Sequence, residues 1–446
     1  MSTDSVSKWL NSIPEPLHPT PFSYRFPIKM VRKRGRPMPP EAINYDHRLL
    51  CDTSCGSPTK WYDAQDSTPR SDANRPHTTR SESGYSLPSS SPSSDASRRL
   101  SPREHLLSLE LGQEGARIRE ISRLQDPSPD LANLQKTIDD ISLGLGILPP
   151  SMRDQLAQHR DERLSTMAKN ESCFSAARDE AGPAPSPSSV IDLLDAAFEC
   201  QENLHAEASW NIEVHSEVLR LALRPPGQPQ FGHLINFMPC STASIINEYL
   251  PTFSTSKNID FCVYMDPCHR DPKIQHAIDI LRGNLSYGVI NYTNYLPLRV
   301  RPIAFNIETK KIGEGWDSAA LRLGVWQAAH WNMLHYLEDL AAPFSVQNST
   351  SATWAIKSGG ESTTTTSREP AQLLDFLPGI VVQGHDWYVV IARREKSQAM
   401  VWTKMAIGAT NSVMGIYQVV HAIQALRKWA LDTYWPRLRR TLLASK

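Results

Sequence analysis

The sequence lacks three features that would assign it to a class at once. Its 47 acidic and 47 basic side chains cancel, so any nucleic-acid signal must come from local clusters rather than from overall charge. Its seven cysteines are odd in number and lack zinc-finger spacing, which disfavours a disulfide scaffold or a metal finger and favours a reducing compartment. No apolar run reaches the roughly 18 residues of a membrane span, and no signal peptide is evident. We therefore expect an intracellular protein without membrane spans.

Proline is abundant instead, and most of its excess over an average protein lies early in the chain. Of 34 prolines in all, three fall within residues 81–102, together with ten serines. Such a segment cannot bury enough apolar surface to offset its chain entropy. We predict a disordered arm over residues 1–102. A second low-complexity stretch, residues 348–367, is interpreted as a mobile surface loop.

Hydrophobic periodicity divides the remainder of the chain. Helical spacing over residues 105–124 and 130–148 predicts a helical lead-in, placed at residues 103–178. A polar, proline-containing break follows. The main domain is then expected over residues 190–437, where aromatic and β-branched residues become more frequent.

The main domain mixes helical and strand-like segments. Within residues 207–223, four side chains form one apolar helical stripe: Trp210, Val214, Val218 and Leu221. Two further long helices are expected at residues 319–337 and from residue 412 to near Pro436. Strand-like runs occur at 258–265, 301–310, 379–383 and 387–392, the last two joined by a hairpin turn at Gly384-His385-Asp386. This order predicts a mixed α/β domain.

Charged side chains within apolar strands are the candidate functional residues. Strand alternation in residues 301–310 places Ile303, Phe305 and Ile307 on one face and Asn306, Glu308 and Lys310 on the other. A carboxylate and an ammonium at the end of a core strand are costly unless they are paired or bind a metal. Asp260, on the polar face of the earlier strand, is expected on the same sheet surface as Glu308. A helix carboxylate, Glu213 or Glu217, is the fourth candidate.

Two strand carboxylates and a lysine suit metal-dependent phosphodiester hydrolysis. Hard divalent cations take oxygen ligands and are often held by one or two carboxylates plus substrate phosphate. A neighbouring lysine can orient or deprotonate water, or neutralise developing charge. The alternative interpretation is structural: Glu308 and Lys310 form a surface pair, Asp260 caps a strand, and the helix glutamates are simply solvated.

With Glu308-Thr309-Lys310 as an E-x-K triplet, these residues resemble the signature of the PD-(D/E)XK nuclease superfamily. Residues 190–437 are similar to a fungal group of such nuclease-like proteins through the segments WNIEVH, IDFCVY, RPIAFNIETKK, LGVWQAAHW and PGIVVQGHDWYVV. The resemblance implies a restriction-endonuclease-like α/β fold, with a mixed central sheet flanked by helices. Many members carry a glutamine on the helix after the triplet. Gln327 is its candidate counterpart here, and Arg322 stands where the fungal group would place it.

The resemblance also implies roles for the candidate residues. Asp260, Glu308 and Glu213 would hold Mg²⁺ or Mn²⁺, and Lys310 would be the catalytic lysine. The implied partner is nucleic acid, with DNA favoured over RNA, and an enzyme that cuts both strands would be expected to act as a homodimer. A different class of protein stays open, namely a non-catalytic DNA-binding or scaffold protein that retains the fold.

A basic cluster lies far upstream of these residues. Lys29 to Pro37 holds five basic residues and no acidic one, and its core resembles an AT-hook: Arg34, Gly35, Arg36 and Pro37. In such a motif, glycine lets the backbone approach the groove floor while arginines enter the narrow minor groove of A·T-rich DNA. A nuclear-localisation signal is the competing interpretation, and a solvated basic linker is the third. The first two predict a nuclear protein, and a chromatin-associated protein acting mainly through this arm is a further alternative.

Overall fold

The computed structural model describes residues 101–444, except for residues 253, 255–257, 268–269, 314 and 348–372. Residues 1–100 of the predicted disordered arm, with the AT-hook-like cluster, therefore lie outside the described residues, as does the low-complexity segment that begins at residue 348. The last two residues of the predicted arm are ordered instead, because Ser101 caps and Pro102 begins the first described helix. Within the described part, no helix is long and apolar enough to cross a membrane.

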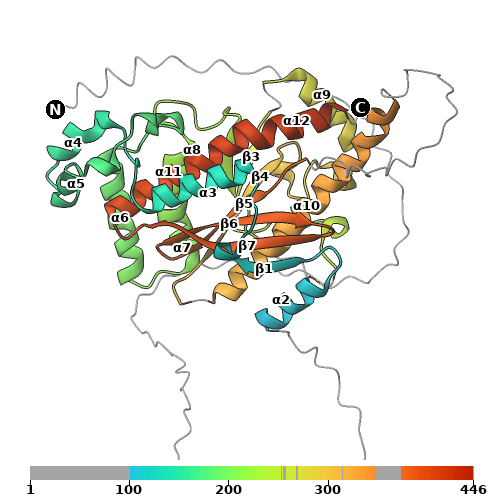
Figure 1. Ribbon diagram of the computed structural model, residues 1–446, viewed down its shortest axis with the longest axis horizontal. Coiled ribbons are helices and arrows are strands. Elements are labelled where there is room, and N and C mark those ends of the chain that lie inside the picture. The colour runs from blue at the N-terminus through green and yellow to red at the C-terminus, as the bar shows by residue number, and fades with distance from the viewer. Residues whose placement is uncertain are drawn as a thin grey trace, which may run out of the picture. The chain divides into compact units, whose positions relative to one another are not determined.

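A seven-stranded mixed sheet lies at the centre of the fold (Figure 1), in the order β1-β7-β6-β5-β4-β3-β2. Its strands are β1 Ala116–Glu120, β2 Ile235–Pro239, β3 Phe261–Met265, β4 Ile303–Lys310, β5 Leu377–Gln383, β6 Asp386–Glu395 and β7 Gln398–Ala409. The β1–β7 and β4–β5 pairs are parallel, and the other four pairs are antiparallel. The four predicted strands are all present, and the predicted mixed α/β fold is confirmed.

The lead-in contributes a strand that the sequence periodicity did not predict. Helix α2 covers Pro102–Leu111, but β1 follows it and pairs in parallel with β7. The helix prediction over residues 105–124 is therefore wrong beyond Leu111. Gly112 and Gly115 explain why the helix ends at Leu111, because they interrupt it and allow the chain to fold back tightly. A Cβ atom on Gly115 would collide with the carbonyl oxygen of Leu109.

Helices cover both faces of the sheet. Helix α10, Trp316–Gln347, packs on one face against β4, β5 and β7, whereas α3 and α11 pack on the other face of β7. The remaining helices are α3 Pro129–Ser142, α4 Arg153–Ala157, α5 Glu162–Met167, α6 Pro187–Glu202, α7 Glu207–Trp210, α8 Ser216–Leu223, α9 Pro272–Arg282, α11 Val413–Trp429 and α12 Trp435–Ala444. The final helical segment thus passes Pro436 instead of ending near it. A π-helical turn at Ala430–Tyr434 precedes this proline, which has no N–H to donate.

Strand β4 is buried on both of its faces. Ile303, Phe305 and Ile307 are in the core as predicted, and α10 also covers the polar face that carries Asn306, Glu308 and Lys310. Continuous burial is typical of a central strand with helices on both sides. The predicted hairpin is confirmed as well: Gly384 and His385 alone connect β5 to β6, and Gly384 has the positive φ of +56° that this tight turn requires.

Candidate functional site

The C-terminal end of β4 carries a buried cluster of opposite charges. Glu308 Oε1 lies 2.7 Å from Lys310 Nζ and 3.3 Å from Nη1 of Arg322 on α10. Lys310 Nζ also lies 3.3 Å from Glu207 Oε2, at the first residue of α7. Glu308 is 0% exposed and Lys310 is 3% exposed. Two carboxylates and two cations from three elements therefore meet at one strand end.

Asp260, the residue immediately before β3, joins this cluster. The β3–β4 register pairs Phe261 with Ile307, so its continuation places Asp260 opposite Glu308. Asp260 Oδ2 accepts a hydrogen bond of 2.8 Å from the backbone N–H of Thr309, and the residue is 8% exposed. The structure thus brings together Asp260, Glu308 and Lys310, three residues that the sequence places as much as 50 positions apart.

The electrostatics of the cluster centre on Glu308. Burial raises the pKa of Glu308 to about 8 and the charge of Asp260 acts in the same direction, while Lys310 and Arg322 oppose the rise. Burial lowers the pKa of Lys310, but its contact with Glu308 outweighs burial, and that pKa is raised overall. Both Glu308 oxygens are buried without a well-aligned hydrogen bond to a described residue, although Oε1 contacts the two cations. A buried carboxylate in this state is costly.

This donor set fits a hard divalent cation. Asp260 and Glu308 offer carboxylate oxygens, and both Glu308 oxygens lack good hydrogen bonds, which a cation would compensate. Within the described ranges, no three His, Cys, Asp or Glu side chains form a complete metal cage. Mg²⁺ usually keeps several waters and takes substrate phosphate as a further ligand, so one or two carboxylates suffice. The site therefore suits a cation shared with a phosphorylated substrate.

The helix carboxylate at this site is Glu207. Glu213 lies on the π-helical turn Asn211–His215, is exposed, and makes no hydrogen bond or ion pair with Asp260, Glu308 or Lys310 in the described structure. Glu217 forms an ion pair of 2.5 Å with Arg220 instead. The structure does not bring Glu213 or Glu217 to the strand residues, because the helix turns a different face towards the sheet.

That face is a polar series with a spacing of four residues: Glu207, Asn211 and His215. Asn211 accepts a hydrogen bond of 2.8 Å from the Thr309 hydroxyl and donates a long one of 3.4 Å to Asp260 Oδ1. His215 lies 2.9 Å from Asn211 Oδ1 and 3.1 Å from the carbonyl oxygen of Gly384, and burial lowers its pKa to about 4. The helix thereby positions Asp260. Three polar residues at intervals of four positions, beside the apolar stripe, are the sequence signal that points to Glu207.

Gln327 and Arg322 differ in their relation to the site. Gln327 is fully buried and donates a hydrogen bond of 2.9 Å to the carbonyl oxygen of Pro378, so it attaches α10 to β5. Arg322, one and a half turns earlier on α10, is the residue that contacts Glu308. The predicted counterpart of the family glutamine is therefore a packing residue, and an arginine stands at the site.

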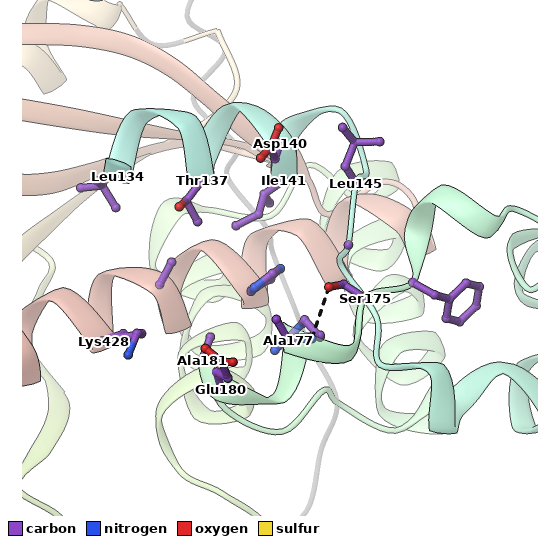
Figure 2. A pocket seen from close by; sticks show the side chains of 15 residues that line it. Leu134, Thr137, Asp140, Ile141, Leu145, Ser175, Ala177, Glu180, Ala181 and Lys428 are labelled. Atoms are coloured by element: carbon purple, nitrogen blue, oxygen red, sulfur yellow. Dashed lines mark hydrogen bonds between the residues drawn. The ribbon is translucent and has the colours of Figure 1, made fainter. Parts of the chain in front are cut away.

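A cavity of about 570 Å³ lies elsewhere, between α3, α11 and the segment around residue 178 (Figure 2). Thr137, Ile141, Ser175 and Lys428 are among its lining residues, and none of the strand or helix residues at the β4 end belongs to it. The concave shape there is thus separate from the charged cluster. The candidate functional site is therefore identified by the charged side chains at the end of β4 and not by the size of a cavity.

Comparison with known proteins agrees with this geometry. The family model described as the PD-(D/E)XK nuclease superfamily matches residues 154–435, a range that holds Asp260, Glu308 and Lys310. No curated protein and no solved structure matches the chain. The matched range begins within the helical lead-in, before the boundary predicted at residue 190. More than half of the chain is covered.

Proposed function

Because the chain belongs to the PD-(D/E)XK nuclease superfamily, we propose that it hydrolyses nucleic-acid phosphodiester bonds with the help of a divalent cation, Mg²⁺ or Mn²⁺. One observation carries this proposal. Two carboxylates, Asp260 immediately before β3 and Glu308 in β4, meet beside a buried lysine, and the Glu308 carboxylate lacks well-aligned hydrogen bonds. A structural ion pair would gain nothing from the second carboxylate, which raises the cost of ionising the first.

The side chains at the site divide the chemical tasks. Asp260 and Glu308 would hold the cation, which when bound supplies Lewis acidity and lowers the pKa of water. Lys310 is held between Glu308 and Glu207, so its ammonium group is fixed where it can orient the attacking water and offset charge on the phosphoryl oxygens. Glu207 and Asn211 position Lys310 and Asp260 from the helix side.

Substrate must approach this buried cluster from its more open side. The side chains of Glu207 and Arg322 are 30% and 36% exposed, in contrast to the enclosed strand residues. Arg322 presents a guanidinium group there, and a guanidinium can bind two phosphate oxygens at once. We assign Arg322 the first contact with the scissile phosphate.

The same sheet face offers further contacts for a nucleic acid. Register pairs Glu308 with Val381 and Val381 with Tyr388, so Tyr388 lies on the same face at about 10 Å, two strand spacings, from Glu308. The ring centroids of Trp316 and Tyr388 are 5.2 Å apart, and Lys404 Nζ lies 5.7 Å from the Trp316 ring. Aromatic rings and cations side by side are typical of surfaces that stack bases and bind the phosphate backbone.

A non-catalytic nucleic-acid-binding protein is the second candidate function. Its support is that Lys310 and Arg322 already offset the charge of Glu308 without a metal. The basic cluster at residues 29–37 would add minor-groove contacts, or nuclear import, under either function. Nuclear localisation therefore stays part of the proposal.

The deciding experiment measures magnesium-dependent cleavage of plasmid, linear duplex, single-stranded DNA and RNA by the full chain and its Lys310→Ala variant. Lys428→Ala is the matched control, because Lys428 also pairs with a carboxylate, Asp432, but at an exposed position outside the site. Cleavage by the wild type and the control that the Lys310→Ala protein loses would support the nuclease. Binding of nucleic acid without cleavage by any of the three proteins would favour the second function.

A further inference from the structure

A basic cavity lies at the end of β4 opposite to the Glu308 site. A cavity of about 480 Å³ is lined by three arginines together with Asp266, Gln275, Pro297 and Val300; the arginines are Arg282, Arg299 and Arg301. Arg301 precedes the first residue of β4, whereas Glu308 lies near the end of that strand. Seven residues of extended chain separate them by about 23 Å. The cavity is therefore distinct from the site at Glu308.

Two of these arginines are fixed in place by the protein. Arg282 donates a hydrogen bond of 2.6 Å from Nε to the carbonyl oxygen of Gly288. Arg301 Nη2 lies 2.9 Å from the buried carboxylate of Asp266, and the guanidinium packs 5.4 Å from the centre of the Tyr264 ring. Fixed guanidinium groups lose less conformational freedom when they bind a ligand, so the cavity is preorganised.

The third arginine is nearly unused. Among the described residues, Arg299 donates only to the carbonyl oxygen of Leu296, at 3.2 Å from Nη1. Neither the Nη2 atom of Arg299 nor that of Arg282 has a hydrogen-bond acceptor in the described part of the structure. Three guanidinium groups face one lining carboxylate, Asp266, with Asp279 as a second one near Arg282. Positive charge and free donors in a confined space favour an anion that can accept several hydrogen bonds.

We propose that this cavity binds an organic phosphate of nucleotide size through its terminal phosphate. A phosphate matches the fork of a guanidinium, and about 480 Å³ is within the range of cavities that take small organic ligands. Pro297 and Val300 provide an apolar wall for the part of the ligand beyond the phosphate. The phosphate can come from a free nucleotide or from the phosphorylated end of a nucleic-acid chain, since both present the same group. The proposal does not depend on nuclease activity.

Calorimetric titration of the full chain tests this proposal. The ligands are inorganic phosphate, AMP, and one short oligonucleotide with and without a 5′-phosphate. EDTA is present throughout, so that no divalent cation can bind phosphate at the Glu308 site. Arg299→Glu is the main variant, because Arg299 is exposed and makes one backbone contact. Arg270→Glu is the matched control: Arg270 is also exposed and also donates to a backbone carbonyl, that of Gly232, but it does not line the cavity.

AMP or the phosphorylated oligonucleotide should bind to the wild type, to the Arg270→Glu control and to Lys310→Ala with similar affinity, and at least tenfold more weakly to Arg299→Glu. Stronger binding of AMP identifies a free nucleotide as the source of the phosphate, and stronger binding of the phosphorylated oligonucleotide identifies a chain end. The proposal is overturned if none of the phosphates binds at millimolar concentration. It is also overturned if Arg299→Glu binds as the wild type does, or if Lys310→Ala rather than Arg299→Glu abolishes binding.

Discussion

The buried carboxyl group of Glu308 makes the stability of the metal-free protein depend on pH. Its pKa is about 8 in the folded protein and 4.5 in an unfolded chain. Between these two values the unfolded state has lost the proton that the folded state keeps, so stability must fall as pH rises. The stabilising contribution of protonated Glu308 to the free energy of unfolding is therefore fully present below about pH 4.5. It is fully lost above about pH 8.

The size of the effect follows from the same two values. A difference from 4.5 to about 8 spans about 3.5 pH units, and each unit corresponds to about 1.4 kcal/mol, which gives roughly 5 kcal/mol in all. Solvent does not screen this carboxyl group, because Glu308 is 0% exposed, so the full value applies. In the Glu308→Gln protein the side chain is neutral at every pH, so this part of the slope should vanish and folding should remain intact.

Urea unfolding in EDTA between pH 5 and 9 measures the difference. The free energy of unfolding of wild type should fall relative to Glu308→Gln by roughly 4 kcal/mol across this window, because the first part of the loss has already occurred at pH 5. Glu217→Gln serves as the control, because Glu217 is a partly exposed helix carboxylate paired with Arg220, and it should follow the wild type. Parallel pH profiles for wild type and Glu308→Gln would refute the assignment of a buried carboxyl group whose pKa is raised to about 8.

Three further predictions concern the core, the arginine at the site and the surface beside it. Phe305→Ala should lower the free energy of unfolding by about 2 to 5 kcal/mol in the same urea assay, because Phe305 is 0% exposed in the centre of the sheet. Arg322→Gln should tighten Mg²⁺ binding severalfold in a calorimetric titration, since it removes a cation 3.3 Å from Glu308 Oε1; weaker binding would mean that Arg322 does not compete with the metal. Lys404→Glu should weaken nucleic-acid binding and flatten its dependence on salt concentration in a gel-shift series, and an unchanged salt slope would remove Lys404 from the interface.

Local patterns sufficed to predict the strands that carry the site. Apolar residues alternate with polar ones in β3 and β4, so the faces of Asp260 and Glu308 followed from a period of two. Strand β7 was missed although it is the longest described, at 12 residues. Its alternation is interrupted where Lys404 adopts a positive φ of 69° and the register with β6 shifts. A bulge of this kind changes which face each side chain occupies, so simple periodicity fails.

The helix residues of the site depend on tertiary packing, and this is why the sequence left them open. Glu213 and Glu217 stand beside the apolar stripe in a regular helix, but the chain contains a π-helical turn at Asn211–His215. The extra residue in that turn rotates the residues on either side relative to one another. Glu207, which precedes the turn, lies 3.3 Å from Lys310 Nζ, whereas Glu213, within the turn, is exposed. Hydrophobic spacing alone does not reveal where a helix departs from 3.6 residues per turn.

Charge balance links the separate features of the site. With Glu308 protonated, Asp260 and Glu207 are matched by Lys310 and Arg322, so the cluster is neutral. Loss of the Glu308 proton leaves the cluster with a net charge of −1. Burial makes this charge unfavourable, and the pKa of Glu308 is raised for that reason. A divalent cation would reverse that balance to +1 and so prepare the cluster for the negative charge of a phosphodiester. Binding of a metal would therefore be coupled to deprotonation of Glu308, and without a metal the carboxyl group lies against Lys310 and Arg322.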